Sequence, residues 1–219
     1  MPAQTFRKLP YRPRDAVRTR AGILAAATAA FAAHGLGGAR VDEIARGAGV
    51  NKALLYHYFG NKQALFLAVL EEVYANIRGA EAALELETEN PPEAMERLVD
   101  FTWEYFLEHP EFITLLNSEN LHRARHLKRS KQVRALHHPL VDRIGEILER
   151  GIARGDFRAD VDPVQLYISI AALGYFYLSN AHTLGTVFDR DLLAESEKEA
   201  RRRHVQDVVR GYLRPVVLS

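Results

Sequence analysis

Glu119 and His122 have the Glu-x-x-His spacing with which helical di-iron carboxylate proteins bind metal. Such a centre needs two copies of the motif, and no other histidine in the chain has a glutamate three positions before it. The chain also has no cysteine and no HExxH, P-loop or GxGxxG motif. We therefore expect no catalytic residue, no metal and no cofactor, and a helical carboxylate-type metal enzyme is kept as an alternative.

Basic residues are concentrated near the N-terminus. Residues 1–62 contain ten lysines and arginines against three acidic residues, whereas the remaining chain has 19 basic and 25 acidic residues. The formal net charge of +1 conceals this division. A basic end on an acidic body is typical of a protein that meets a polyanion at one end. Nucleic acid is the polyanion that we expect.

Residues 40–59, RVDEIARGAGVNKALLYHYF, predict two short helices joined by a tight turn. Ala45 is small enough for the helices to cross, Gly49 suits the positive φ of the turn, and Asn51 suits the N-cap of the second helix. The positions expected to pack the two helices together are Ile44, Ala48, Val50, Leu55 and Tyr58. This pattern indicates a helix-turn-helix whose second helix enters the DNA major groove, although an ordinary helical hairpin is an alternative.

The stretch 23–70 resembles the DNA-binding region of the TetR family of bacterial repressors. The matching residues are Phe31-x-x-x-Gly35, Val41-x-x-Ile44-Ala45, Ala48-Gly49-Val50, Leu55-Tyr56-x-Tyr58-Phe59 and Lys62-x-x-Leu65. Beyond residue 70 the chain is similar to the family in architecture only. The resemblance implies a repressor that binds a palindromic double-stranded DNA operator as a homodimer and is released by a small-molecule effector, and it does not name the effector.

The resemblance also implies roles for individual residues. Tyr56 and His57 match family residues that reach phosphates and base edges, and Lys62 matches a position that binds phosphate. Arm residues such as Arg7 and Arg12 could follow the minor groove. The predicted DNA-contacting residues are Arg40, Asn51, Lys52, Ala53, Leu54, Tyr56, His57 and Lys62.

The chain departs from the family pattern at two places. Ala53 and Leu54 stand where the family often has Gly, Ser or Thr, so they cannot donate hydrogen bonds to bases but could pack on thymine methyl groups. Arg40 stands where a small hydroxyl residue commonly caps the helix. It brings the cap hydrogen bond into question and adds a charge attracted to phosphate.

Apolar residues recur at helical spacing along the chain and predict an all-α fold of about nine helices. We predict a flexible basic arm at 1–14, a three-helix DNA-binding head at 15–62 and a ligand-sensing and dimerisation bundle at 63–219. The state of 122–134 is left undecided. The helices are expected at about 15–34, 41–48, 51–58, 61–87, 93–108, 111–121, 139–154, 162–185 and 192–213.

The last two helices are expected to pair with their copies in a second subunit, because the run 164–178 is apolar nearly all round and needs cover on every face. Packing within one subunit is the alternative. The predicted dimer interface on the last helix consists of Val205, Val208, Val209 and Tyr212.

Aromatic residues on the helices at 93–121 and 139–182 are interspersed with polar ones, as in many ligand pockets, although each could equally be core. The predicted effector contacts are Trp103, Phe106, Asn120, Tyr175 and Asn180. A ligand-free architectural DNA-binding protein is a further alternative. No signal-like or bilayer-spanning segment is recognised, so we expect a cytoplasmic protein without a membrane partner.

Overall fold

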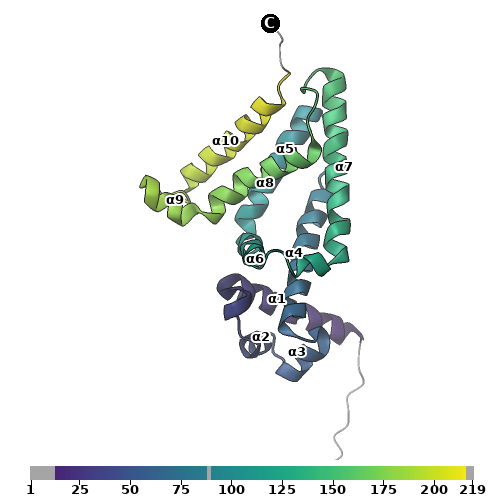
Figure 1. The fold of residues 1–219 in the computed structure, drawn as a ribbon, viewed down its shortest axis with the longest axis vertical. Coiled ribbons are helices and arrows are strands. Elements are labelled where there is room, and N and C mark those ends of the chain that lie inside the picture. Colours follow the sequence, from purple (N-terminus) through teal and green to yellow (C-terminus); the bar gives the residue numbers. More distant parts are fainter. Residues whose placement is uncertain (1–12, 88–89, 216–219) are drawn as a thin grey trace, which may run out of the picture. The chain divides into compact units, whose positions relative to one another are not determined.

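The computed structural model describes residues 13–87 and 90–215, with the backbone alone for 13, 14 and 136–138. These residues form ten α-helices and one short 3-10 helix and contain no strand, which confirms the all-α prediction (Figure 1). The helices are α1 (Pro13–Gly38), α2 (Val41–Gly47), α3 (Lys52–Phe59), α4 (Lys62–Ala82), α5 (Pro91–Glu108), α6 (Pro110–Leu121), η1 (Leu127–Arg129), α7 (Lys131–Arg154), α8 (Pro163–Ser179), α9 (Ala181–Phe188) and α10 (Glu195–Leu213).

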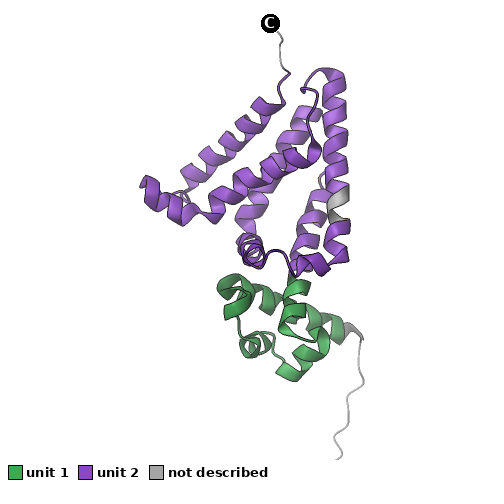
Figure 2. Cartoon of the chain, viewed as in Figure 1, with its two compact units in different colours: residues 1–69 green, residues 70–219 purple. Residues whose placement is uncertain are grey.

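The chain divides into two compact units, residues 1–69 and 70–219 (Figure 2). The division falls inside α4, whereas the sequence places the boundary after Lys62. We refer to them as the head unit and the body unit. The head unit contains α1, α2, α3 and the first part of α4, so it is built around the predicted helix-turn-helix.

The long first helix, α1, is apolar enough by length and composition to cross a membrane. Its apolar stripe is nevertheless completely buried at Ile23, Ala27 and Phe31. The ring of Phe31 meets the edge of Phe66 from α4 at 5.1 Å between centroids. The apolar character of α1 is thus that of a core helix. Gly35, with φ of 63°, interrupts its helical backbone near the end.

In the body unit, α5 packs against α7, α8 and α10 (Figure 1). One apolar core joins these four helices, with Leu98, Ile144, Ile170 and Val205 among its buried members. A smaller cluster joins Trp103 to residues of α8 and α9 and the loop after α9. The apolar character of α8 is explained in part by this packing, which covers one of its faces.

Three predicted helix boundaries are wrong. α7 begins at Lys131 instead of Pro139, because Ser130 caps it by accepting a hydrogen bond from the amide of Val133 at 3.1 Å. The helix predicted to run to 185 is interrupted at Asn180, whose backbone (φ −113°, ψ 11°) separates α8 from α9. α4 ends at Ala82 instead of 87, and Arg143 donates to the backbone carbonyls of Glu81 in its last turn and of Leu84 beyond its end.

Candidate nucleic-acid interface and effector site

The segment 41–59 folds as a helix-turn-helix. Gly49 has a φ of +66°, which is the conformation that the turn requires of this residue. Oδ1 of Asn51 accepts a hydrogen bond from the amide of Leu54 at 2.8 Å and caps α3. Ile44 and Leu55 are buried with exposed fractions of 1% and 0%. The predicted turn and cap are therefore confirmed, and the predicted packing face is buried at Ile44 and Leu55 and partly buried at Ala48, Val50 and Tyr58.

The outer face of α3 consists of five exposed residues. Leu54 and Tyr56 are unusually exposed for large apolar side chains, at 37% and 36%. A helix that shows apolar and hydrogen-bonding side chains to solvent over a well-buried inner face is suited to reading base edges. The five residues are Lys52, Ala53, Leu54, Tyr56 and His57.

Three cations lie on or beside this face and have weak local partners. Arg40 precedes α2, makes no side-chain cap hydrogen bond and lies 3.9 Å from Glu43. Nζ of Lys52 lies 3.2 Å from Asp42, and Nζ of Lys62 donates to the carbonyl of Gly37 at 3.3 Å. Surface ion pairs contribute little free energy and exchange readily with phosphate. The predicted arm contacts of Arg7 and Arg12 lie outside the described residues.

Two of the predicted effector contacts are packed as core. The indole of Trp103 is 3% exposed and meets the ring of Tyr177 edge-on at 5.8 Å. Phe106 is 4% exposed and stacks on Phe112 at 5.9 Å between centroids. Both rings also lie against Gly174 of α8, where a Cβ atom would be 3.3 Å from Phe106. Their surfaces are covered by other helices of the body unit, and the prediction that they line an effector pocket stays a prediction.

The other three predicted contacts are polar and less buried. The hydroxyl of Tyr175 donates to Oδ1 of Asn117. Burial raises the pKa of Tyr175, while a hydrogen bond with Asn120 opposes this shift. Asn120 itself is exposed. Asn180 donates to the carbonyl of Phe176 at 2.8 Å, so its amide is used to end α8. The structure therefore brings Tyr175 and Asn120 together, while the side-chain amide of Asn180 is used at the end of α8.

A buried charged cluster lies on α4, which the sequence analysis missed. Nη1 of Arg78 lies 2.6 Å from Oε2 of Glu81, and both side chains are at most 5% exposed. Nη2 of Arg78 donates to the hydroxyl of Tyr167 at 3.0 Å. Burial raises the pKa of Glu81 to about 7, against the opposing effect of Arg78. Burial also raises the pKa of Tyr74 to about 12, so this tyrosine keeps its proton.

The sequence held one signal for this cluster. Arg78 and Glu81 have the i,i+3 spacing of an ion pair on one helix face. Such pairs are normally on the surface, and burial of this one depends on α8, which supplies Tyr167 from 89 positions further along the chain. Its place in the interior could not be read from local spacing.

A pocket of about 300 Å³ opens between α4 and α7 beside this cluster. Arg78, Glu81 and Arg143 supply its charged groups. The rest of its lining is small or apolar and consists of Ala75, Gly79, Ala82, Ala135, Pro139 and Leu140. Pockets with apolar walls and few polar groups are typical of small-molecule binding.

The Glu119–His122 spacing does not produce a metal centre. Oε2 of Glu119 lies 2.6 Å from Nδ1 of His126, and Oε1 accepts hydrogen bonds from the amides of His126 and Leu127 at 2.8 and 3.0 Å. Among the described residues, no group of three His, Asp or Glu side chains could hold a metal ion. Glu119 serves to anchor the segment between α6 and α7, which contains η1.

The predicted interface residues of α10 divide into two sets. Val205 and Val209 are 2% and 4% exposed and belong to the core of the body unit, so the prediction that they contact a partner is corrected. Val208 and Tyr212 are 39% and 45% exposed and stay available. Exposed apolar residues also follow α8 at spacings of four and eight residues, at Val164, Ile168 and Phe176.

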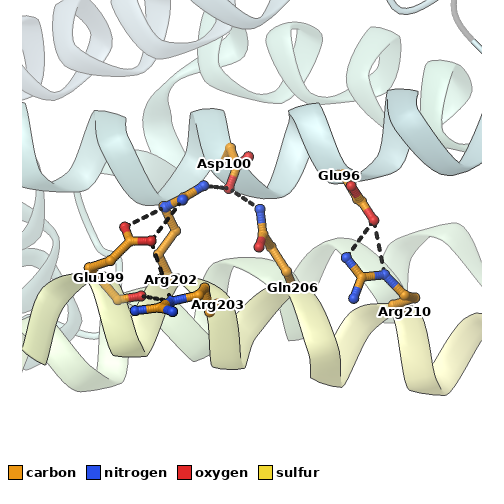
Figure 3. Close-up of polar contacts among 7 residues, drawn as sticks. All are labelled: Glu96, Asp100, Glu199, Arg202, Arg203, Gln206 and Arg210. Atoms are coloured by element: carbon orange, nitrogen blue, oxygen red, sulfur yellow. Dashed lines mark hydrogen bonds and ion pairs between the residues drawn. The ribbon is translucent and has the colours of Figure 1, made fainter.

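A row of polar contacts fixes α10 on α5 (Figure 3). Arg202 and Gln206 both bind the carboxylate of Asp100, at 3.1 and 2.7 Å, and Arg210 binds Glu96 at 2.6 Å. Arg202 also pairs with Glu199 on its own helix at 2.9 Å. These contacts hold α10 so that Val208 and Tyr212 face solvent.

Comparison with family models gives two matches. Residues 23–69 match the model described as bacterial regulatory proteins, tetR family. Residues 91–209 match the model described as tetracyclin repressor-like, C-terminal domain. The first match covers the helix-turn-helix, and the second covers most of the body unit.

The proteins to which the chain is similar are also transcriptional regulators. The chain is 40% identical over 208 residues to the HTH-type transcriptional repressor NicS of Pseudomonas putida, covering 95% of this chain and 98% of that protein. It is 40% identical over 108 residues to the repressor SCO4008 of Streptomyces coelicolor, covering 49% and 53%. The crystal structure of the putative regulator SCO4942 of Streptomyces coelicolor has the same fold, with a TM-score of 0.67 at 23% identity and coverage of 89% and 98%.

Proposed function

The chain belongs to the TetR family of transcriptional regulators, and from this premise we propose that it is a ligand-responsive repressor that binds a palindromic operator as a homodimer. It is a regulator and not an enzyme. The proposal places it in the cytoplasm, with double-stranded DNA, a second copy of itself and a small-molecule effector as partners.

The exposed outer face of α3 carries this proposal. Lys52 and His57 supply a cation and a hydrogen-bonding ring, and Tyr56 supplies a hydroxyl for phosphates or base edges. Ala53 and Leu54 offer an apolar surface that suits thymine methyl groups. Arg40, Asn51 and Lys62 flank the face, and their charges and amide suit the phosphate backbone.

Two copies are needed to read a palindrome, because one recognition helix contacts only a few base pairs and half-sites lie about 34 Å apart. We assign the dimer interface to the exposed apolar residues of α8 and α10, with Val208 and Tyr212 as its members on α10. A two-fold axis would bring the same patch of each subunit together.

The effector is proposed to act through α4, a continuous helix from Lys62 to Ala82 that enters both units. A ligand that binds one arrangement of head and body better than the other shifts the balance between them. The pocket beside Arg78 favours a ligand-responsive protein over a ligand-free architectural one. Tyr175 and Asn120 stay proposed effector contacts.

An electrophoretic mobility shift with DNA from upstream of the protein's own gene tests the proposal. We expect the wild type to bind, and Tyr56→Ala and His57→Ala to bind weakly with unchanged thermal stability. His34→Ala, an exposed histidine outside the motif, is the matched control and should bind normally. Equal binding by all four proteins would refute the assignment of α3 as the recognition helix.

A further inference from the structure

Arg78 is a buried cation whose hydrogen-bonding capacity is only partly used. The residue is 6% exposed, and one of its nitrogens donates to Tyr167. Within the described part of the chain, Nε has no hydrogen-bond acceptor, whereas Nη1 is engaged in the ion pair with Glu81 at 2.6 Å. A guanidinium has five N–H donors, and burying donors without acceptors is costly. This arrangement suits the binding of an additional hydrogen-bond acceptor beside Arg78.

The neighbouring pocket provides a place for that acceptor. It is lined by Arg78 and Glu81 on α4 and by Arg143 on α7, and its volume of about 300 Å³ is at the small end of ligand pockets. A side chain at Gly79 would meet no atom within 4 Å, which shows that this wall is open. A ligand that brings a hydrogen-bond acceptor into this pocket would place a compact apolar body against Ala75, Ala82, Ala135 and Leu140.

The charges of the pocket favour an anion. Two arginines and one carboxylate line the pocket, so the lining carries a net positive charge, although Arg143 is also paired with Glu87 outside the lining at 2.9 Å and donates to the carbonyl of Glu81 at 2.8 Å. Oε2 of Glu81 is the atom that pairs with Nη1 of Arg78, at 2.6 Å. Because burial raises the pKa of Glu81 to about 7, this carboxyl can take a proton when another anion replaces it beside Arg78. The protonated carboxyl of Glu81 can then donate a hydrogen bond to the incoming anion.

We propose that the pocket between α4 and α7 binds a small organic oxyanion, with its carboxylate on Arg78 and a compact apolar body against the alanine-lined walls. A planar carboxylate matches the guanidinium fork in a bidentate manner, whereas phosphate offers the same oxygens without the apolar body. The inference rests on the proposed function, since the anion is the effector of that function.

Calorimetric titration of the full-length protein tests this inference with matched probes. Benzoate and pentanoate are compared with benzamide and pentanamide, which have nearly the same shape without the charge, and inorganic phosphate is a third arm. We expect one carboxylate per chain, bound at least about tenfold more tightly than its amide, since hydrogen bonds to charged groups are the stronger ones. Phosphate should bind more weakly than either carboxylate.

Variants locate the site. Arg78→Gln should remove the preference for carboxylate over amide. Arg150→Gln is the matched control, because Arg150 also donates to carbonyls of the 86–87 loop but lies outside this pocket. Gly79→Leu should fill the pocket and abolish carboxylate binding while leaving Arg78 in place. If Arg78→Gln does not fold, Gly79→Leu tests whether the carboxylate binds in this pocket.

Several results would overturn the inference. These are equal affinity for carboxylates and amides, no carboxylate binding at millimolar concentration, a preference that survives in Arg78→Gln, or binding that survives in folded Gly79→Leu. Phosphate that binds as tightly as the carboxylates would also overturn it, as would loss of the preference in Arg150→Gln.

An electrophoretic mobility shift distinguishes failure of the anion inference from failure of the repressor proposal. If operator binding is intact but carboxylates fail, the anion is wrong and the repressor proposal stands; if no DNA is bound, the repressor proposal fails.

Discussion

The ring of Phe157 lies directly over Gly151 of α7, so closely that a Cβ atom at Gly151 would overlap the ring carbon Cδ2. The chain reaches this position by turning at Gly155, whose φ is +78°, and the amide of Phe157 then donates to the carbonyl of Gly151 at 3.2 Å. Phe157 is 6% exposed and belongs to the core of the body unit. The end of α7 is thus closed by an aromatic ring that only glycine admits.

Gly151→Ala is therefore expected to destabilise the protein by about 1–3 kcal/mol, as overpacking of a well-filled core does. Gly145→Ala on the same helix is the matched control, because its Cβ would meet no atom within 4 Å. This control should stabilise by about 0.5–1 kcal/mol through helix propensity. Urea unfolding of both variants measures the two effects, and a stabilising Gly151→Ala would contradict the packing described.

Lys62→Ala is expected to weaken operator binding with little change in sequence preference, because phosphate contacts position a protein without specifying sequence. The dependence of log K on log salt should become flatter by about one unit. Lys128→Ala, an exposed lysine of the body unit, should leave the slope unchanged. Fluorescence anisotropy at several salt concentrations gives both slopes, and identical slopes for Lys62→Ala and wild type would count against the phosphate contact.

Val208→Glu combined with Tyr212→Glu is expected to give monomers that no longer hold a palindromic site. Both side chains are solvent-exposed on α10, so the double change should leave the core of the body unit intact. Leu121→Glu, at an 84% exposed leucine at the end of α6, controls for the added charge. Light scattering measures the mass, and a dimeric double variant would rule out this interface.

The buried carboxyl of Glu81 predicts a pH dependence of stability. Its pKa is about 7 in the folded protein against 4.5 for an unperturbed glutamate, so the folded state holds the proton more tightly. The stability that this group contributes is present below about pH 4.5 and is lost as the pH rises through 7. Glu81→Gln cannot titrate and should lack this component.

Unfolding curves at several pH values test the assignment through the difference between wild type and Glu81→Gln. The free energy of unfolding of the wild type should fall relative to that of the variant between pH 4.5 and 7. A difference that is constant over this range would show that the pKa of Glu81 is unperturbed, and a difference that rises with pH would show that it is lowered; either result would contradict the assignment.

The head unit was predictable from sequence because its determinants are local. The turn needs a glycine at 49, the cap needs a short polar side chain at 51, and the outer face of α3 follows from helical periodicity once Leu55 is known to be inside. Each of these requirements involves residues a few positions apart. Such local requirements can be recognised in a single sequence.

The body unit was predicted less well because its determinants are distant or compete. Pro139 favours a helix start, yet the cap at Ser130 begins α7 earlier. Periodicity on α10 selects Val205 and Val208 alike, and only the packing of α5 and α8 determines which is covered. The local sequence places Arg78 on a helix surface, and its burial depends on α8, which supplies Tyr167.

The row of polar contacts between α5 and α10 has an evolutionary consequence. On a helix, residues 202, 206 and 210 lie on one side, while 204, 208 and 212 lie on another. The side chains that secure α10 to its own subunit are thus distinct from the exposed Val208 and Tyr212, which we propose contact a partner. Mutations on the partner side can accumulate without loosening the subunit, so duplicated copies of such a gene within one genome could diverge until their products no longer form mixed dimers.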